Sequence, residues 1–210
     1  MNPGSIVIRR ASTGSGSLVL LFHGVGGRPD NLLALGQRIA DAIPDGTVVS
    51  VAGPHPSPAA GGREWFGVNG ITEQNRPERV AGAMQGFVAD IRGWQQAVDA
   101  TMDATVLVGF SQGGMMSLEA SVRPSFPAAR VIAMGSRFAS LPERAPAQET
   151  RIHLLHGQDD TVIPCGHAID GASRLRSLGV EVTLDVLAAT GHRISAEMAD
   201  RAVDRLLDRV

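Results

Sequence analysis

The stretch TVLVGFSQGG, residues 105–114, decides the fold of this protein. A run rich in valine, typical of a buried strand, leads directly into a serine that stands between glycines in the pattern G-x-S-x-G. A helical pattern follows. Strand, tight turn and helix in this order are typical of a nucleophile elbow, in which the turn exposes the hydroxyl of Ser111. The simpler alternative is an ordinary strand-to-helix turn in which Ser111 caps the helix.

The composition is that of an ordinary globular protein. Of the 210 residues, 43% are hydrophobic and 19% are charged, and the formal net charge is -2. This length predicts a single domain over residues 1–210, and no basic block points to nucleic acid. The single cysteine, Cys165, excludes an internal disulfide bond. No signal peptide is recognised and no apolar segment approaches the about 18–20 residues that cross a bilayer, so we expect a cytoplasmic protein without stable membrane insertion.

Short apolar runs recur along the chain, and most of them do not alternate with polar residues. Near-continuous runs predict strands that are covered on both faces, as in a parallel sheet. These runs are 17–22, 47–52, 105–110, 130–135 and 151–157. Two further runs, SIVIRR (5–10) and VTLDVL (182–187), alternate better, and we expect them at the edges of the sheet.

Helical patterns lie between these runs, at 30–42, at 78–98, from Ser111 to about Arg123, at 167–178 and from Ser195 onward. The segment 78–98 is the clearest, with apolar residues at helical spacing. Strand and helix in alternation predict an α/β fold, with a mostly parallel central sheet, helices on both faces and no large lid domain. Residues 53–77, dense in proline and glycine, predict a long functional loop.

A serine hydroxyl needs a base within hydrogen-bond reach, and the base needs an orienting partner. Downstream of Ser111, the loop ATGHRIS (189–195) carries His192 and the loop after 151–157 carries Asp159 and Asp160. Both loops follow strands, so they should emerge at the same edge of the sheet as Ser111. His192 is the predicted base, because the other histidines lie within a strand, begin a helix, lie in the proline-rich loop or precede the serine. Spacing alone leaves the two aspartates open, and either is also a common turn residue.

These motifs together resemble the bacterial phospholipase/carboxylesterase family of α/β-hydrolases, which are relatives of the acyl-protein thioesterases. The resemblance covers nearly the whole chain. It is carried by LFHGVGG (21–27), GREWF (62–66), GFSQGG (109–114), HGQDDTVIP (156–164) and TGH (190–192). The stretch GITEQNRPERV (70–80) is similar to a subgroup of small bacterial esterases.

The resemblance implies an α/β-hydrolase fold and assigns roles by position. The acid of the H-G-x-x-D-x-x-x-P motif falls on Asp160, with Asp159 as the alternative. The backbone N–H groups of the oxyanion hole fall on Val25 and Gln112. A glycine-rich turn after a strand suits this task, because a tetrahedral oxyanion needs two donors. His23, within the same turn, is expected to be structural.

The expected substrate pocket involves Trp65, Phe66 and Met115, although Trp65 and Phe66 are equally suited to anchoring the loop and Met115 to filling the core. The region before Arg63 lacks the long apolar insertion expected of lipid-accepting relatives. GSRFASLP (135–142) replaces a less bulky family segment, and Arg137 and Phe138 would narrow or charge the entrance. Both departures indicate short or medium acyl groups.

The predicted function is that of a serine carboxylesterase that hydrolyses short- to medium-chain acyl esters through an acyl-enzyme. Ser111, His192 and Asp160 would form the triad, without a metal or organic cofactor. The alternatives are an acyl thioesterase or lysophospholipase, and a hydrolase-fold ligand-binding protein with little turnover. The expected partner is a small-molecule ester or thioester. A homodimer is possible from the resemblance, but no self-associating surface is readable in the sequence.

Overall fold

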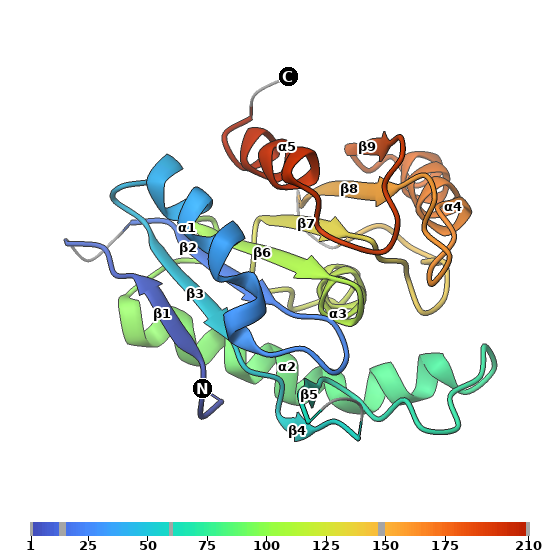
Figure 1. Cartoon of the computed structure of the whole chain (residues 1–210), viewed down its shortest axis with the longest axis horizontal. Helices are drawn as coiled ribbons and strands as arrows, with labels where there is room; N and C mark the ends of the chain where they lie inside the picture. The colour runs from blue at the N-terminus through green and yellow to red at the C-terminus, as the bar shows by residue number, and fades with distance from the viewer. Residues whose placement is uncertain (1, 13–15, 59–60, 147–149, 209–210) are drawn as a thin grey trace.

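The computed structural model describes residues 2–12, 16–58, 61–146 and 150–208. In these residues seven strands form one sheet in the order β1-β3-β2-β6-β7-β8-β9 (Figure 1). Their bounds are β1 Ile6–Arg9, β2 Leu18–Phe22, β3 Thr47–Val51, β6 Thr105–Phe110, β7 Arg130–Met134, β8 Arg151–Gly157 and β9 Val182–Leu187. Only the pair β1 and β3 is antiparallel among these neighbours, so the mostly parallel sheet predicted from the sequence is confirmed.

Both faces of the sheet are buried, which explains the continuous apolar runs. In β2, Leu18, Leu20 and Phe22 pack into one core cluster, and Val19 and Leu21 pack into the other. The two edge strands are β1 and β9, as their alternating sequences predict. Side chains of a central strand therefore need to be apolar on both sides, whereas an edge strand tolerates polar residues.

Helices cover the two faces unequally (Figure 1). Helices α1 (Leu33–Ala42) and α5 (Ala196–Leu206) pack on one face, and α2 (Arg76–Val98), α3 (Gln112–Ser121) and α4 (Gly166–Ser177) pack on the other. Ser195 caps α5 as predicted, because its Oγ accepts a hydrogen bond from the Met198 N–H at 3.1 Å. None of the helices in the described parts of the chain combines the length and apolar character that crossing a bilayer requires.

The helix boundaries differ from the expected ones by small amounts. The segment expected as a helix over 30–42 begins with a 3₁₀ turn, η1 (Pro29–Leu32), before α1. Helix α2 begins at Arg76 instead of 78, and Pro77 is accommodated in its first turn because a missing N–H costs no hydrogen bond there. Helix α3 ends at Ser121, two residues before the expected Arg123.

The long loop between β3 and α2 holds a short hairpin, β4 (His55–Pro56) with β5 (Arg63–Glu64). The Oε2 of buried Glu64 accepts a hydrogen bond from the Ser57 hydroxyl at 3.1 Å. Arg63 also forms an isolated β-bridge with Gly27, in the turn that follows β2. The hairpin therefore joins the loop to the edge of the sheet where β2 ends.

Candidate active site

Ser111 lies at a strained turn between β6 and α3. Its backbone has φ 52° and ψ -117°, a region that residues other than glycine rarely adopt. The flanking glycines allow the tight packing. A Cβ at Gly109 would lie 2.5 Å from the Gly114 Cα, and one at Gly113 would lie 2.3 Å from the Phe22 carbonyl oxygen. The Ser111 N–H bonds to the Met134 carbonyl at 2.9 Å, which ties the turn to the neighbouring strand.

Three side chains from distant parts of the chain meet at this turn. The His192 Nε2 lies 3.0 Å from the Ser111 Oγ, and its Nδ1 lies 2.7 Å from the Asp160 Oδ2. Because an ionised carboxylate can only accept, the Nδ1 carries the proton and the Nε2 is free to accept from the serine hydroxyl. The structure therefore brings together the three residues that the sequence nominates for nucleophile, base and acid.

Asp160 is held as a carboxylate at the end of β8. Its Oδ1 accepts the N–H groups of Val162 at 2.9 Å and Ile163 at 2.8 Å, while Oδ2 faces His192. Burial opposes ionisation, but the hydrogen bonds from His192 and the two N–H groups outweigh it and lower the pKa of Asp160 below its ordinary value. The charge that His192 needs as a partner is therefore present at neutral pH.

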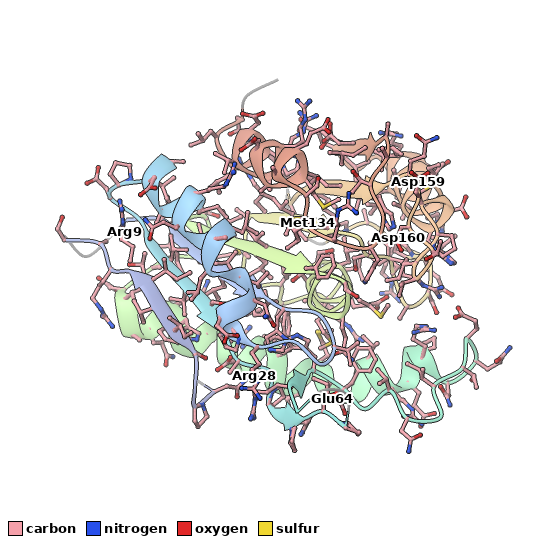
Figure 2. The ribbon with its side chains drawn as sticks, viewed as in Figure 1. Arg9, Arg28, Glu64, Met134, Asp159 and Asp160 are labelled. Carbon is pink, nitrogen blue, oxygen red and sulfur yellow. The ribbon has the colours of Figure 1, made fainter. Side chains whose placement is uncertain are left out.

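Asp159 does not share this setting. Its side chain is exposed, while that of Asp160 is buried. Figure 2 labels both residues beside the carboxyl end of β8. The Asp159 N–H donates to the Thr190 carbonyl at 2.9 Å, so the residue helps to join the acid loop to the histidine loop through its backbone.

The ring of His192 packs against Phe110, with ring centroids 4.9 Å apart and an angle of 38° between the planes. Phe110 was not predicted as a site residue, because an aromatic residue at the end of a strand is indistinguishable in sequence from one that fills the core. Its position directly before Ser111 is the only signal. The contact restricts the imidazole to the space between Ser111 and Asp160.

The other histidines that are buried have structural bonds. His23 accepts the Gly53 N–H at its Nε2 (3.0 Å) and its Nδ1 lies 2.8 Å from the Gly24 carbonyl, so it braces the turn after β2. His156 lies 2.7 Å from the Ile163 carbonyl and 3.3 Å from the Asp160 Oδ2 through its Nε2. Burial lowers the pKa of His23, which favours its neutral form.

Val25 and Gln112 line the same cavity as Ser111, and the resemblance places the oxyanion-hole donors on their backbone N–H groups. Among the described residues, neither N–H has a hydrogen-bond acceptor. Gln112 is the first residue of α3, where intrahelical acceptors are lacking and the helix dipole favours negative charge. Both N–H groups are thus free to donate to a ligand in this cavity.

Hydrogen bonds from the segment 63–66 fix the positions of Gln112 and of the turn that carries Val25. The Arg63 carbonyl accepts the Gly26 N–H at 2.9 Å, and the Trp65 indole N–H donates to the His23 carbonyl at 2.8 Å. The Gln112 side chain bonds to the backbone N–H of Trp65 (2.9 Å) and to the carbonyl of Phe66 (2.8 Å). This role of the Gln112 side chain was not predictable from the sequence, because hydrogen bonds between a side chain and a distant backbone segment leave no local pattern.

A cavity of about 340 Å³ opens at Ser111. Its lining residues are Val25, Phe66, Val68, Glu73, Arg76, Ser111, Gln112, Met115, Arg137, Val162, Ile163, Pro164 and His167. The structure places Phe66 and Met115 in this lining, but the expectation for Trp65 as a pocket wall is corrected. Trp65 is 2% exposed and packs edge-on against Phe22, at a centroid distance of 5.3 Å, so it anchors the loop.

Of the two residues expected at the cavity entrance, Arg137 and Phe138, only one belongs to the lining. Arg137 lines the cavity, whereas Phe138 is buried in the core cluster beneath α2, α3 and α4 and does not reach the lining. Three residues that were not predicted to be in the pocket also belong to the lining: Glu73, Arg76 and His167. They come from the loop before α2, from the start of α2 and from the start of α4, and only the packing of these elements brings them together.

The fold and the strained serine turn define an α/β-hydrolase. Residues 4–206 match the phospholipase/carboxylesterase family model, so the chain belongs to that family and the resemblance found in the sequence is confirmed. Over 206 residues it is 42% identical to Esterase YpfH of Escherichia coli (strain K12), which covers 98% of this chain and 88% of that protein.

Two further comparisons agree. The solved structure of esterase PE8 superposes with a TM-score of 0.90 at 28% identity, over 100% of both chains. Acyl-protein thioesterase 1 of Gibberella zeae is 30% identical over 115 residues, which are 50% of this chain and 49% of that protein. The protein is therefore a hydrolase of the esterase and thioesterase type.

Proposed function

We propose that this hydrolase is a serine carboxylesterase that cleaves esters of short- and medium-chain acids through an acyl-enzyme on Ser111. The observation that carries the proposal is the continuous chain of contacts from the Ser111 Oγ to the His192 Nε2 (3.0 Å) and from the His192 Nδ1 to the Asp160 Oδ2 (2.7 Å). These distances lie within the range at which a proton passes between hydrogen-bonded groups.

In the first step the Ser111 oxygen attacks the ester carbonyl while His192 takes the hydroxyl proton. Asp160 orients the imidazole and stabilises the imidazolium that forms. The negative charge on the carbonyl oxygen of the tetrahedral intermediate is then met by the N–H groups of Val25 and Gln112. Collapse of this intermediate releases the alcohol, which receives its proton from His192.

In the second step a water molecule attacks the acyl-enzyme with His192 again as the base. The free acid leaves and the Ser111 hydroxyl is restored. Neither step needs a bound metal or an organic cofactor, because the residues supply the nucleophile, the base and the charge stabilisation.

The cavity supports the proposed substrate size. Its volume of about 340 Å³ is at the small end of ligand pockets, which span roughly 300–1,000 Å³. Apolar side chains, Phe66, Val68 and Met115 among them, form much of its wall and would contact the hydrocarbon part of an acyl group. A pocket of this size favours short and medium chains over long lipids.

The test is the steady-state hydrolysis of 4-nitrophenyl esters from acetate to dodecanoate. We expect the highest kcat/KM between butyrate and octanoate, and a loss of about 10⁴-fold or more in Ser111→Ala. An unchanged rate in Ser111→Ala would refute the proposed nucleophile. A maximum at dodecanoate would refute the proposed acyl length.

Matched oxygen and sulfur esters separate the proposed ester preference from a thioesterase. The name of Esterase YpfH, the relative at 42% identity, supports the ester. A fluorophosphonate probe separates an enzyme from a binding protein: rapid labelling of Ser111 with turnover supports the proposal, whereas labelling without turnover on any ester contradicts it. The cytoplasmic location and a homodimer stay predictions.

A further inference from the structure

The wall of the active-site cavity carries a group of charged and polar side chains that the proposed chemistry does not use. Glu73, Arg76, Arg137 and His167 lie together there, from three separate parts of the sequence. Two guanidinium groups share one carboxylate. Burial, and next the neighbouring charge of Arg137, lower the pKa of His167, so the imidazole is largely neutral at neutral pH. The charged side chains of the described lining therefore sum to +1.

Arg137 is fixed by three contacts. Its Nε–H donates to the Phe138 carbonyl at 3.1 Å, one Nη lies 3.0 Å from the His167 Nε2, and the other Nη bonds to Glu73. A guanidinium has five N–H donors, so two remain for another acceptor. The side chain is only 12% exposed, which means that its orientation is set by the protein before any ligand arrives.

Arg76 has even more N–H donors without an acceptor among the described residues. One Nη donates to the Glu73 Oε1 at 2.7 Å. The Nε–H is buried and has no acceptor among the described residues. A buried donor without an acceptor costs free energy, and a ligand oxygen that reached it would recover that cost.

Glu73 is the more exposed partner of this group. Its side chain is 59% exposed, compared with 19% for Arg76 and 12% for Arg137. Hydrogen bonds from Arg137 and Arg76 lower its pKa to about 2, so it is ionised throughout the neutral range. The carboxylate thus lies on the solvent side of two more deeply placed cations and leaves part of their donor capacity free.

We propose that Arg76 and Arg137, braced by Glu73 and His167, bind a carboxylate carried by the substrate, so that the enzyme prefers esters with an anionic group at the far end of the acyl or alcohol chain. This inference rests on the proposed ester hydrolysis and specifies its substrate class. Planar guanidinium groups hold carboxylates through paired, charge-assisted hydrogen bonds, and such bonds strengthen in a cavity partly closed to water. The apolar residues between Ser111 and the cations would contact the intervening chain.

The first experiment compares esters that differ only in charge. On the acyl side, mono-4-nitrophenyl adipate is compared with 4-nitrophenyl 6-methylheptanoate, in which an isopropyl group replaces the carboxylate. On the alcohol side, the butyrate ester of glycolate is compared with isobutyl butyrate by titration of the released acid. We expect one of the two pairs to favour the anionic ester, by about tenfold or more in kcat/KM. The pair that responds identifies the side of the ester that faces the arginines.

Variants then test the residues. Arg137→Gln and Arg76→Gln should each lower the anionic-to-neutral ratio by about tenfold, since each removes a charged donor. Glu73→Gln should raise the ratio, because it removes the competing carboxylate. Arg92→Gln is the matched control: Arg92 lies on α2, is exposed and is absent from the cavity lining, so the ratio should not change.

A binding measurement makes the result independent of turnover. Ser111→Ala protein should bind monomethyl adipate more tightly than the dimethyl ester, and 0.5 M NaCl should weaken the difference. The inference is wrong if both ester pairs are hydrolysed without an anionic preference. It is also wrong if Arg137→Gln lowers the melting temperature but not the anionic-to-neutral ratio, because the charged group then only stabilises the loop before α2. If no ester is hydrolysed in a Ser111-dependent way, the proposed function itself fails.

Discussion

His192 and Asp160 lie 32 positions apart in the chain, yet the Nδ1 of the one is 2.7 Å from the Oδ2 of the other. The contact joins the loop after β9 to the loop after β8. A parallel pairing of these two strands, in which Gly157 lies opposite Leu187, brings the loops to the same edge of the sheet. The contact between His192 and Asp160 therefore follows directly from the register of β8 and β9.

This relationship predicts different outcomes for the two neighbouring aspartates. Asp160→Asn should reduce kcat by about 10³–10⁴-fold at pH 7, because an amide neither fixes the His192 tautomer nor stabilises the imidazolium. Asp159→Asn is the matched control and should change kcat less than about threefold, since its side chain is exposed. Equal losses in both variants would contradict the assignment of Asp160.

The tight turn at Ser111 predicts that Gly113→Ala destabilises the protein. The added Cβ would lie 2.3 Å from the Phe22 carbonyl oxygen, which belongs to the backbone of β2 and cannot move aside freely. We expect a loss of about 3 kcal/mol or more in the free energy of unfolding, measured with urea.

Gly82→Ala is the control for that substitution. Gly82 lies on an exposed turn of α2, and nothing comes within 4 Å of a Cβ placed there. The free energy of unfolding should therefore rise by about 0.5–1 kcal/mol, because alanine favours the helix. A Gly113→Ala protein as stable as the unmodified chain would show that the turn is looser than described.

Because its indole is buried, Trp65 is expected to hold the turn after β2 in position but not to influence which acyl chain length is preferred. Trp65→Phe loses the hydrogen bond to the His23 carbonyl, and we expect about 1–3 kcal/mol less stability together with a lower kcat, since the turn that carries Val25 is loosened. The acyl-length profile should keep its maximum. Met115→Ala, which enlarges the cavity itself, should move the maximum to longer chains. A shifted profile in Trp65→Phe would place the indole against the substrate.

The free energy of unfolding should decrease at acidic pH, partly because His153 is buried in the folded protein. Burial, with a smaller effect of Arg130 and Arg205, lowers the pKa of His153 from 6.5 to about 4. Between these values the unfolded chain binds a proton that the folded protein does not, so the free energy of unfolding decreases as the pH falls through this window, by at most about 3 kcal/mol at pH 4.

Urea unfolding at pH 7.5 and pH 5 measures this contribution. The difference between the two pH values should shrink in His153→Gln, which cannot titrate. His55→Gln, at an exposed histidine in β4, should leave the difference as it is. An unchanged difference in His153→Gln would show that this histidine does not carry the acid sensitivity.

Much of the fold was predictable because it depends on local patterns. Central strands must be apolar on both faces, and edge strands need not be, so the strand order at the margins follows from periodicity. The elbow is encoded within the short pattern around Ser111, and the base follows from its place in a loop after a strand. Helix ends were less predictable, as Pro77 shows, because a proline in the first turn neither requires nor prevents an earlier start.

By itself, then, the sequence determined the α/β-hydrolase fold and nominated Ser111 and His192, since each depends on neighbours a few residues away. Spacing left Asp159 and Asp160 open and the family resemblance favoured Asp160, but only the tertiary structure shows that Asp160 is the one that faces His192. The tertiary structure also buries Trp65 in the core, places Phe66 in the cavity lining and bonds the Gln112 side chain to the backbone of Trp65 and Phe66. It also brought Arg76 and Arg137 together in the wall of the cavity that opens at Ser111. Adjacent residues share one local pattern, and their different roles arise from which way the backbone turns each side chain and from the distant elements that it then meets.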